Sequence, residues 1–208
     1  MGLVWAVVGL VAAAGPSKLE VPGSIEAMNE QRERVDVVLA ARSNLTEAER
    51  AAVSWAIVEE SARAGYDPFL ILGLMDVESD FRRDVVSSAD ARGLMQIQPI
   101  TLGYLIEKNH WPISQADVAA DPALCVRLGV RYVRQLHDRF GTLTAALMAY
   151  NMGPTKYKRL SKTPAALEAY QSYPNAVRRD ARALKARHTL PATALQQAGL
   201  DAKQRPDS

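Results

Sequence analysis

The amino-acid sequence predicts an all-α, mainly helical protein, and three observations favour this fold class. Aromatic residues make up only 6% of the 208 residues, whereas strands usually accumulate aromatic and β-branched side chains. Ala, Leu and Arg, which are good helix formers, are abundant. Helix-start signals recur along the chain, and several precede apolar residues spaced three to four positions apart, as in helices with one buried face.

Three helices are expected in the first part of the chain. Residues 25–41 have a helical but highly charged pattern. Residues 46–64 begin with the T-x-x-E spacing of a capping box and precede a glycine, which often ends a helix. Residues 67–81 begin with Asp-Pro, an N-cap followed by a first-turn proline. The third helix is almost entirely apolar, so most of its circumference must be buried.

The rest of the chain predicts a loop followed by further helices. Residues 82–98 contain Ser, Asp and Gly without a sustained period, which indicates a loop or a short hairpin. Residues 121–140 repeat the Asp-Pro start, and apolar side chains recur in them at every fourth position. Residues 142–150 are expected to form a compact apolar helix, and residues 164–187 two more.

Four segments are expected along the sequence. Residues 1–15 form a signal peptide or short membrane anchor, and residues 16–44 form a linker and a charged helix. Residues 45–188 form the helical domain with basic C-terminal helices, and residues 189–208 form a flexible tail. A domain of this size buries roughly 70% of its extended-chain surface, so it needs no disulfide or metal for stability.

The first 15 residues are an uncharged apolar run similar to the core of a secretory signal. The run is too short to cross a bilayer comfortably, because a spanning helix needs about 20 apolar residues. Ala12 and Ala14 offer a cleavage pattern, although no basic residue precedes the run. Export is the leading interpretation, and a retained anchor or a helix of the mature fold are the alternatives.

Basic side chains are concentrated near the C-terminus, although the net charge of the chain is only 25 − 23 = +2. The near-neutral total weighs against a nucleic-acid-binding protein. Between residues 154 and 188, Glu168 and Asp180 are outnumbered by Lys156, Lys158, Arg159, Lys162, Arg178, Arg179, Arg182, Lys185 and Arg187. These cations indicate either a solvated helix face or contact with an anionic polymer such as cell-wall glycan, phospholipid or nucleic acid.

No metal and no organic cofactor is implied by the sequence. Cys125 is the single cysteine and the three histidines are scattered, so neither an intramolecular disulfide nor a structural zinc cluster is expected. The sequence also lacks the motifs of zinc proteases, phosphate-binding loops and serine hydrolases.

Glu78 is the most unusual polar residue of the helix predicted at 67–81. At 100° per residue it lies within about 20° of Ile71, so it continues the apolar stripe, whereas Asp76 and Asp80 fall on the opposite, solvated side. A carboxyl group desolvated by apolar neighbours has a raised pKa and can act as a general acid near neutral pH. The alternatives are a structural glutamate paired with an arginine, or one that reaches water at the helix end.

Three motifs occur in order along the chain: Glu78-Ser79, Gly93-Leu94-Met95-Gln96 and Ala149-Tyr150-Asn151-Met152-Gly153-Pro154. They resemble the motifs of the soluble lytic transglycosylase domain of glycoside hydrolase family 23, which is related to goose-type lysozymes. The resemblance covers about residues 50–160 and implies a lysozyme-like helical fold. Val77 departs from it, since the family often has glutamine before its catalytic glutamate. The basic segment after Pro154 lies outside the shared pattern.

By this resemblance, Glu78 is the single catalytic acid and base of a peptidoglycan lytic transglycosylase. Such an enzyme cleaves the β-1,4 bond between N-acetylmuramic acid and N-acetylglucosamine and forms a 1,6-anhydro ring. Hydrolases normally use a second carboxylate, and the matched motifs contain none. The alternatives are a hydrolytic muramidase of the same fold and a wall-binding or assembly protein of a secretion, conjugation or phage-entry apparatus.

The resemblance also implies substrate-binding roles for residues of the three motifs. Tyr150 is expected to hydrogen-bond and orient Glu78, with a core tyrosine as the alternative. Asn151 and Gln96 carry amides that suit the N-acetyl or hydroxyl groups of a sugar, although an asparagine there also fits a helix C-cap. Met95 offers an apolar wall for a sugar face, or simple core packing.

Ser79, next to Glu78, is expected to hydrogen-bond either the substrate or the backbone. The expected partner is the glycan strand of peptidoglycan, and no nucleic acid is expected. The expected location is exported, in the periplasm or associated with the cell envelope. Membrane proximity through the N-terminus and a cell-envelope assembly partner are further expectations.

Overall fold

The structure, a computed structural model, describes residues 25–163 and 165–188. The predicted leader at 1–15, most of the predicted linker and the predicted tail at 189–208 lie outside the described residues.

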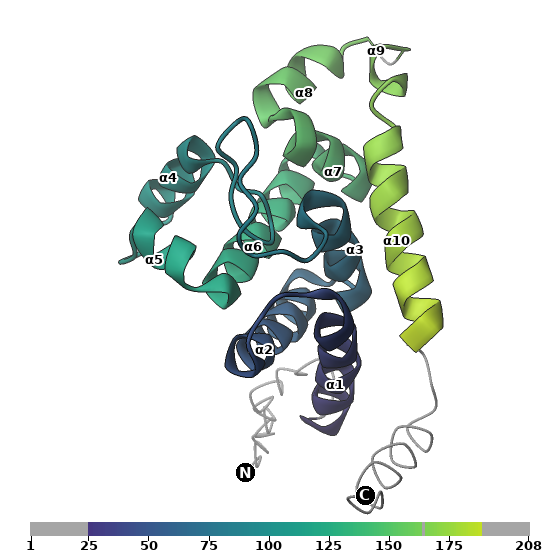
Figure 1. The fold of residues 1–208 in the computed structure, drawn as a ribbon. Helices are drawn as coiled ribbons and strands as arrows, with labels where there is room; N and C mark the ends of the chain where they lie inside the picture. The colour runs from purple at the N-terminus through teal and green to yellow at the C-terminus, as the bar shows by residue number, and fades with distance from the viewer. Residues whose placement is uncertain (1–24, 164, 189–208) are drawn as a thin grey trace, which may run out of the picture.

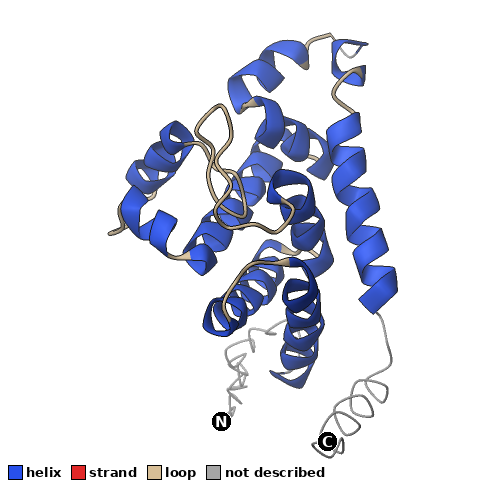
Figure 2. Cartoon of the chain, viewed as in Figure 1, coloured by secondary structure: helices blue, strands red, loops and turns tan. Residues whose placement is uncertain are grey.

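The described part of the chain is helical, and Figures 1 and 2 show helices joined by loops. No strand occurs in it, so the prediction of an all-α fold is confirmed. Isolated bridges join Arg92 to Val86 and to Ile97, so the segment 82–98 is a loop and not a hairpin. The helices are α1 (Ile25–Arg42), α2 (Glu47–Ala64), α3 (Pro68–Ser79), α4 (Pro99–Lys108), α5 (Gln115–Ala120), α6 (Pro122–Phe140), α7 (Leu143–Met152), α8 (Pro154–Leu160), α9 (Ala165–Glu168) and α10 (Ser172–His188).

The strongest sequence signals predict helix bounds close to those observed. The capping box of α2 forms at Thr46, and the Asp-Pro starts of α3 and α6 are both present. Helix α3 ends at Ser79, two residues before the predicted end, because Asp80 and Phe81 adopt left-handed backbone angles with φ of 51° and 60°. A left-handed residue cannot continue a right-handed helix, so the chain turns away directly after Glu78 and Ser79.

The short helices α4, α5 and α8 were not predicted. They contain 10, 6 and 7 residues, and so few turns give too little apolar periodicity to detect. The start of α4 also lacks a side-chain cap at Gln98. These helices are held by their contacts with the rest of the domain, since isolated helices of this length are marginal in water.

Helix α10 packs closely along α3 and runs antiparallel to it (Figure 1). A Cβ atom added at Gly73 of α3 would lie 2.5 Å from the carbonyl oxygen of Val177 and 2.6 Å from the backbone nitrogen of Ala181. Only glycine allows this approach of the two backbones. Since Lys185 pairs with Asp67 at the start of α3, the first turn of α10 lies beside the end of α3.

Helix α6 lies at the centre of the domain, with α2 and α7 packed against it (Figure 1). Its inward face carries apolar side chains such as Val126, Val130 and Val133, which are almost fully buried. None of the helices in the described residues is sufficiently long and apolar to span a membrane.

Candidate active-site cleft

A cavity of about 240 Å³ lies where α3, α4, α6, α7 and the loop 82–98 meet. Helix α3 contributes Glu78, α4 contributes Thr101 and α6 contributes Tyr132. The remaining lining residues come from the loop and from the end of α7: Ser87, Ala91, Gln96, Ile97, Gln98, Tyr150, Asn151, Met152 and Gly153. The second and third motifs of the sequence therefore both reach the cavity that contains Glu78.

Glu78 lies in the last turn of α3 and is largely shielded from water. The pKa of its carboxyl group is raised from 4.5 to about 7, because burial, which raises the pKa, outweighs a hydrogen bond from Tyr173, which lowers it. A carboxyl group with this pKa exchanges its proton near neutral pH, as a general acid and base must do. Among the described residues that line the cavity, Glu78 is the one carboxyl group.

Tyr173, in the first turn of α10, is the hydrogen-bond partner of Glu78 and was missed by the sequence analysis. Its hydroxyl group donates to Glu78 Oε1. Burial, and then the neighbouring Glu78 and Tyr150, hold the pKa of Tyr173 well above its ordinary value, so the phenol keeps its proton. The two residues are 95 positions apart in the chain, and only the antiparallel packing of α10 on α3 brings them together.

The prediction that Tyr150 hydrogen-bonds Glu78 is wrong. The Tyr150 hydroxyl group donates instead to the carbonyl oxygen of Met95, at 2.6 Å. Its ring packs against that of Tyr132 with 5.5 Å between the ring centroids. Burial, followed by the nearby Glu78, raises the pKa of Tyr150 well above its usual value. Tyr150 thus lines the cavity and anchors the loop, whereas Tyr173 contacts the acid.

Met95 cannot form a wall for a sugar, because its side chain is fully buried. It packs onto Gly129 of α6, where an added Cβ atom would lie 2.5 Å from Met95 Cε. The absence of a side chain at Gly129 makes the notch that Met95 fills. The alternative interpretation of Met95, simple core packing, is the one that the structure supports.

Ser79 and Gln96 hold the loop against α3. The Ser79 hydroxyl group contacts the carbonyl oxygens of Leu94 and Met75, at 3.0 and 3.2 Å, so it bonds the backbone. Gln96 Nε2 donates to the carbonyl oxygens of Val85 and Gly93, both at 3.0 Å. The nitrogen of the Gln96 amide is therefore occupied by the loop. No hydrogen bond from the described part of the chain reaches its side-chain oxygen, although Gln96 lines the cavity.

Asn151 lies at the mouth of the cavity and is exposed. It belongs to the last turn of α7, and the residue that caps this helix is Gly153, so the C-cap interpretation of Asn151 is wrong. No hydrogen bond within the described residues occupies its side chain. The amide is consequently able to donate to and accept from a ligand.

Asp76 and Asp80 lie on the side of α3 away from Glu78. They were predicted to be solvated, but both form ion pairs. Arg42 Nη2, at the end of α1, lies 2.8 Å from a carboxylate oxygen of each. The guanidinium group also lies 5.0 Å from the centre of the Phe81 ring. Helix α1 therefore fixes the end of the helix that carries Glu78.

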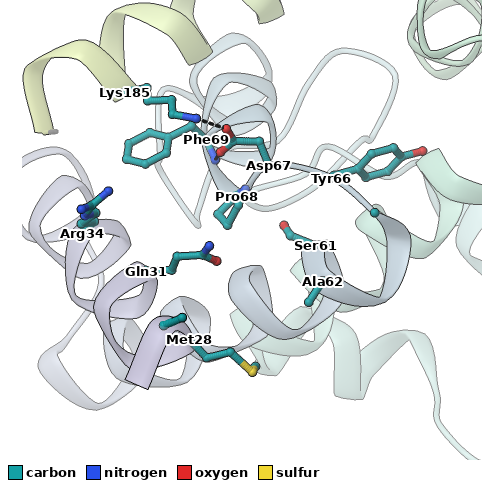
Figure 3. A pocket seen from close by; sticks show the side chains of 12 residues that line it. Met28, Gln31, Arg34, Ser61, Ala62, Tyr66, Asp67, Pro68, Phe69 and Lys185 are labelled. Carbon is teal, nitrogen blue, oxygen red and sulfur yellow. Dashed lines mark hydrogen bonds and ion pairs between the residues drawn. The ribbon is translucent and has the colours of Figure 1, made fainter. Parts of the chain in front are cut away.

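Two larger cavities among the described residues contain no comparable acid. One of about 410 Å³ lies between α1, α2, the start of α3 and α10, and Figure 3 shows its acidic residue, Asp67, paired with Lys185. The other, of about 570 Å³, lies against the loop 82–98 and is mostly apolar. Its acidic residues are also engaged, since Asp90 pairs with Arg92 and Asp84 accepts a hydrogen bond from an asparagine. Glu78 differs because its hydrogen-bond partner within the described chain is a phenol.

Residues 56–173 match the family model described as the transglycosylase SLT domain. The chain belongs to the SLT family. The match extends from α2 to Tyr173, so it includes Lys156, Lys158, Arg159 and Lys162. The expectation that the basic segment after Pro154 lies outside the shared pattern is therefore wrong for these four residues. Helix α1 and most of α10 lie outside the matched SLT domain.

Proteins with related sequences carry transglycosylase names. The transglycosylase of Enterobacteria phage PRD1 is 32% identical over 117 residues, which are 56% of this chain and 38% of the phage protein. The membrane-bound lytic murein transglycosylase C of Haemophilus influenzae strain PittGG is 32% identical over 136 residues, 59% of this chain and 38% of the relative. The chain therefore spans little more than a third of these relatives' lengths.

Solved structures with the SLT fold agree with the architecture described above. Lytic transglycosylase Slt from Pseudomonas aeruginosa matches with a TM-score of 0.56 and 26% identity, over 65% of this chain and 24% of that protein. The soluble lytic transglycosylase of Escherichia coli has the same TM-score at 18% identity, over 81% of this chain and 31% of that one, and shows similarity of fold alone.

Proposed function

We propose that this protein is a peptidoglycan lytic transglycosylase with Glu78 as its single acid and base. The observation that carries the proposal is the shielded Glu78 carboxyl group, with a pKa of about 7, in a cavity lined otherwise by neutral polar and apolar side chains. The membership of the SLT family and the names of the relatives support the same activity. The bond cleaved would join N-acetylmuramic acid to N-acetylglucosamine.

Bond cleavage would begin with proton transfer from Glu78. A glycosidic oxygen is a poor leaving group until it is protonated, and positive charge grows at the anomeric carbon as the bond breaks. Tyr173 occupies Oε1 of Glu78, which leaves Oε2 for the glycosidic oxygen. The Glu78 proton goes to that oxygen, and the carbon–oxygen bond breaks with its electron pair.

Ring closure would then use the ionised Glu78 as a base. The 6-hydroxyl group of the same muramic acid attacks the anomeric carbon, its oxygen forms the new bond, and its proton returns to Glu78. Atoms and charge balance without water, and the product is a 1,6-anhydro sugar. A cycle that needs one group for both proton transfers fits a cavity whose described lining contains one carboxyl group.

The other site residues would hold the acid and the sugar. Tyr173 positions Glu78 by donating a hydrogen bond to it, and this hydrogen bond moderates the rise in the pKa of Glu78. The amide of Asn151 and the side-chain oxygen of Gln96 suit N-acetyl and hydroxyl groups of the glycan. Ser79, Met95 and the Tyr150 hydroxyl group support the loop rather than the substrate.

The location proposed for the protein is the periplasm or cell envelope, following export. The apolar leader at residues 1–15 and the envelope substrate support this proposal. The relative from Haemophilus influenzae is named as membrane-bound, in keeping with membrane proximity through the leader.

Mass spectrometry of muropeptides released from purified peptidoglycan tests the proposed function. The full chain should release products lighter by one water molecule than reducing muropeptides, and Glu78→Gln should release none. The matched control is Glu59→Gln, which makes the same chemical change at a glutamate of α2 that pairs with Arg63 and Arg127, away from the cavity. This control should leave the products unchanged.

Two results would contradict the proposal. Products with free reducing ends would make the protein a hydrolytic muramidase of the same fold. If the folded full chain binds sacculi but releases no products, the protein would instead be a wall-binding or assembly protein.

A further inference from the structure

Helix α8 and the turn after it present a cationic surface that the proposed catalytic steps do not use. The α8 cationic surface comprises Lys156, Lys158, Arg159 and Lys162, all of which are exposed. The inward side of the same helix is occupied by Tyr157, which is buried and packs its ring against Phe140 with 4.7 Å between centroids. The helix is therefore fixed to the domain by its apolar side while its charges face solvent.

The α8 cationic surface differs from most other basic groups of the domain in lacking acidic partners. Arg42 of α1, Arg63 of α2 and Arg131 of α6 form ion pairs with acidic side chains, as do Arg179 and Lys185 of α10. In the described part of the chain, no ion pair involves a member of the α8 cationic surface. Lys156 contacts the ring of Tyr170, with 4.9 Å between its Nζ and the ring centroid, which leaves its charge uncompensated.

The α8 cationic surface begins at the edge of the Glu78 cavity. Asn151, Met152 and Gly153 line that cavity, and α8 starts at the next residue, Pro154. With a rise of about 1.5 Å per residue, the α carbon of Arg159 lies roughly 9 Å along the helix from Gly153. A polymer that leaves the cavity past Gly153 would therefore pass within reach of these long side chains.

We infer that the α8 cationic surface binds the carboxylates of the peptide stems on a glycan strand seated in the Glu78 cavity. This inference rests on the proposed function, and it deepens it by making the favoured substrate a strand that carries its peptides. The sugar rings and N-acetyl groups are neutral, so they offer nothing for four cations. The stems branch from the muramic acid residues and carry free carboxylates, which supply the complementary charge.

Continuity with the cavity favours this partner over a lipid surface or a nucleic acid. The cations adjoin the place where the glycan would lie, and a charge that acts on the same polymer adds to the affinity without a second binding partner. Exposed ion pairs contribute little individually and are weakened by salt. Several of them beside one strand would select between substrates of different charge while leaving the chemistry at Glu78 unchanged.

The test compares two variants of the full chain that lose the same charge. Lys158→Gln/Arg159→Gln removes two cations of the α8 cationic surface. Arg182→Gln/Arg187→Gln removes two exposed cations of α10 and is the matched control. Both are assayed on native sacculi and on sacculi whose carboxylates have been converted to methylamides with carbodiimide and excess methylamine.

The Lys158→Gln/Arg159→Gln variant should have a raised KM on native sacculi. We expect KM to rise roughly fivefold for Lys158→Gln/Arg159→Gln on native sacculi, with kcat unchanged. On methylamide sacculi the same variant should match the wild type, and the control variant should match it on both substrates. Equal losses on the two kinds of sacculi, or no loss on native sacculi, would overturn the inference.

Binding measurements keep this test separate from that of the proposed function. Each double variant is combined with Glu78→Gln, and co-sedimentation with the two kinds of sacculi is measured without any cleavage. Weaker binding of the α8 variant to native sacculi alone supports the inference even if the wild type releases no anhydro products. Co-sedimentation with vesicles of phosphatidylglycerol is measured as well. If the α8 variant binds these vesicles more weakly while its binding to sacculi is intact, the surface would be assigned to lipid and the inference overturned.

Discussion

Glu60 and Glu78, both in the described part of the chain, are partly or fully shielded from water, and their pKa values shift in opposite directions. Glu60 of α2 is 2% exposed, and its carboxylate faces α6. Glu78 of α3 is also largely shielded and faces the cavity. The pKa of Glu60 lies below its ordinary value, whereas that of Glu78 is raised to about 7.

The difference comes from the partners and not from the burial. Burial by itself would raise the pKa of Glu60, but the hydrogen bonds and charge of Arg131, with Arg63 and Arg127, outweigh it. Arg131 donates to both oxygens of Glu60, at 2.7 and 3.0 Å. Glu78, by contrast, is bonded by the neutral hydroxyl group of Tyr173. A buried carboxyl group thus becomes an acid near neutral pH only where the fold withholds a cation.

The largest expected effect separates the two glutamates by activity. Glu78→Gln should lower kcat by roughly a thousandfold or more, because the amide cannot donate the proton that cleavage requires. The folded fraction of Glu60→Gln should have the same kcat as the wild type. The measurement is the rate of anhydro-product release per folded protein, with folding followed by circular dichroism. A comparable fall in kcat for the two variants would remove the functional distinction between the two sites.

The second-largest expected effect is on stability, and here Glu60 is the important residue. Glu60→Gln should lower the free energy of unfolding by about 3 kcal/mol at pH 7, because the buried cluster loses its charged acceptor. The neighbouring Glu59→Gln, which loses more exposed pairs with Arg63 and Arg127, should cost less than about 1 kcal/mol. Urea unfolding measures both values. Equal losses would mean that burial adds nothing to the Glu60 pairs.

The pH dependence of stability should also have opposite signs at the two sites. Between about pH 4.5 and pH 7 the unfolded chain releases the Glu78 proton while the folded chain retains it, so this residue lowers stability as the pH rises. Glu78→Gln should therefore gain about 2 to 3 kcal/mol over the wild type by pH 8 and nothing at pH 4. Unfolding at several pH values tests this.

Glu60 provides the internal control for that measurement. Its lowered pKa stabilises the fold above the ordinary carboxyl pKa, and this stabilisation is lost as the pH falls through the folded value. The difference in the free energy of unfolding between the wild type and Glu60→Gln should therefore shrink towards acid pH. Parallel pH trends for Glu60→Gln and Glu78→Gln would contradict the contrast.

The smallest expected effect concerns the partner of Glu78. Tyr173→Phe removes the hydrogen bond that lowers the pKa of Glu78, so the alkaline limb of the pH–rate profile should move up by roughly one unit or less. Tyr150→Phe is the matched control, because its hydroxyl group bonds the Met95 carbonyl oxygen and not Glu78. It should cost about 1 kcal/mol of stability and leave the alkaline limb in place. A shift of that limb in Tyr150→Phe alone would reassign the partner.

Local signals were interpreted correctly where the physics is local. The capping box at Thr46, the Asp-Pro starts of α3 and α6 and the apolar stripe that includes Glu78 involve residues within a few positions of one another. Their bonds form whenever those segments become helical, so the sequence predicts them directly. The end of α3 was misjudged because left-handed angles at Asp80 and Phe81 leave no pattern in the residue types.

The roles of the motif residues could be predicted only in part. The second and third motifs reach the cavity, but sequence spacing could not tell which side chains face it. Met95 turns into the notch at Gly129, and the Tyr150 hydroxyl group turns to the Met95 carbonyl oxygen. These directions depend on backbone approaches between segments far apart in the chain.

The sequence by itself determined the helical class and the identity of the unusual acid, because apolar periodicity and helix caps are properties of neighbouring residues, and its three short motifs indicated the family by resemblance. The tertiary structure alone decided which partner Glu78 has. The contact of Tyr173 with Glu78 spans 95 positions and requires the close passage of α10 over Gly73. The tertiary structure also gave Glu60 its arginine partners from α6, and it gave Glu78 a neutral phenol. The pKa of a buried group depends on such distant partners as much as on burial.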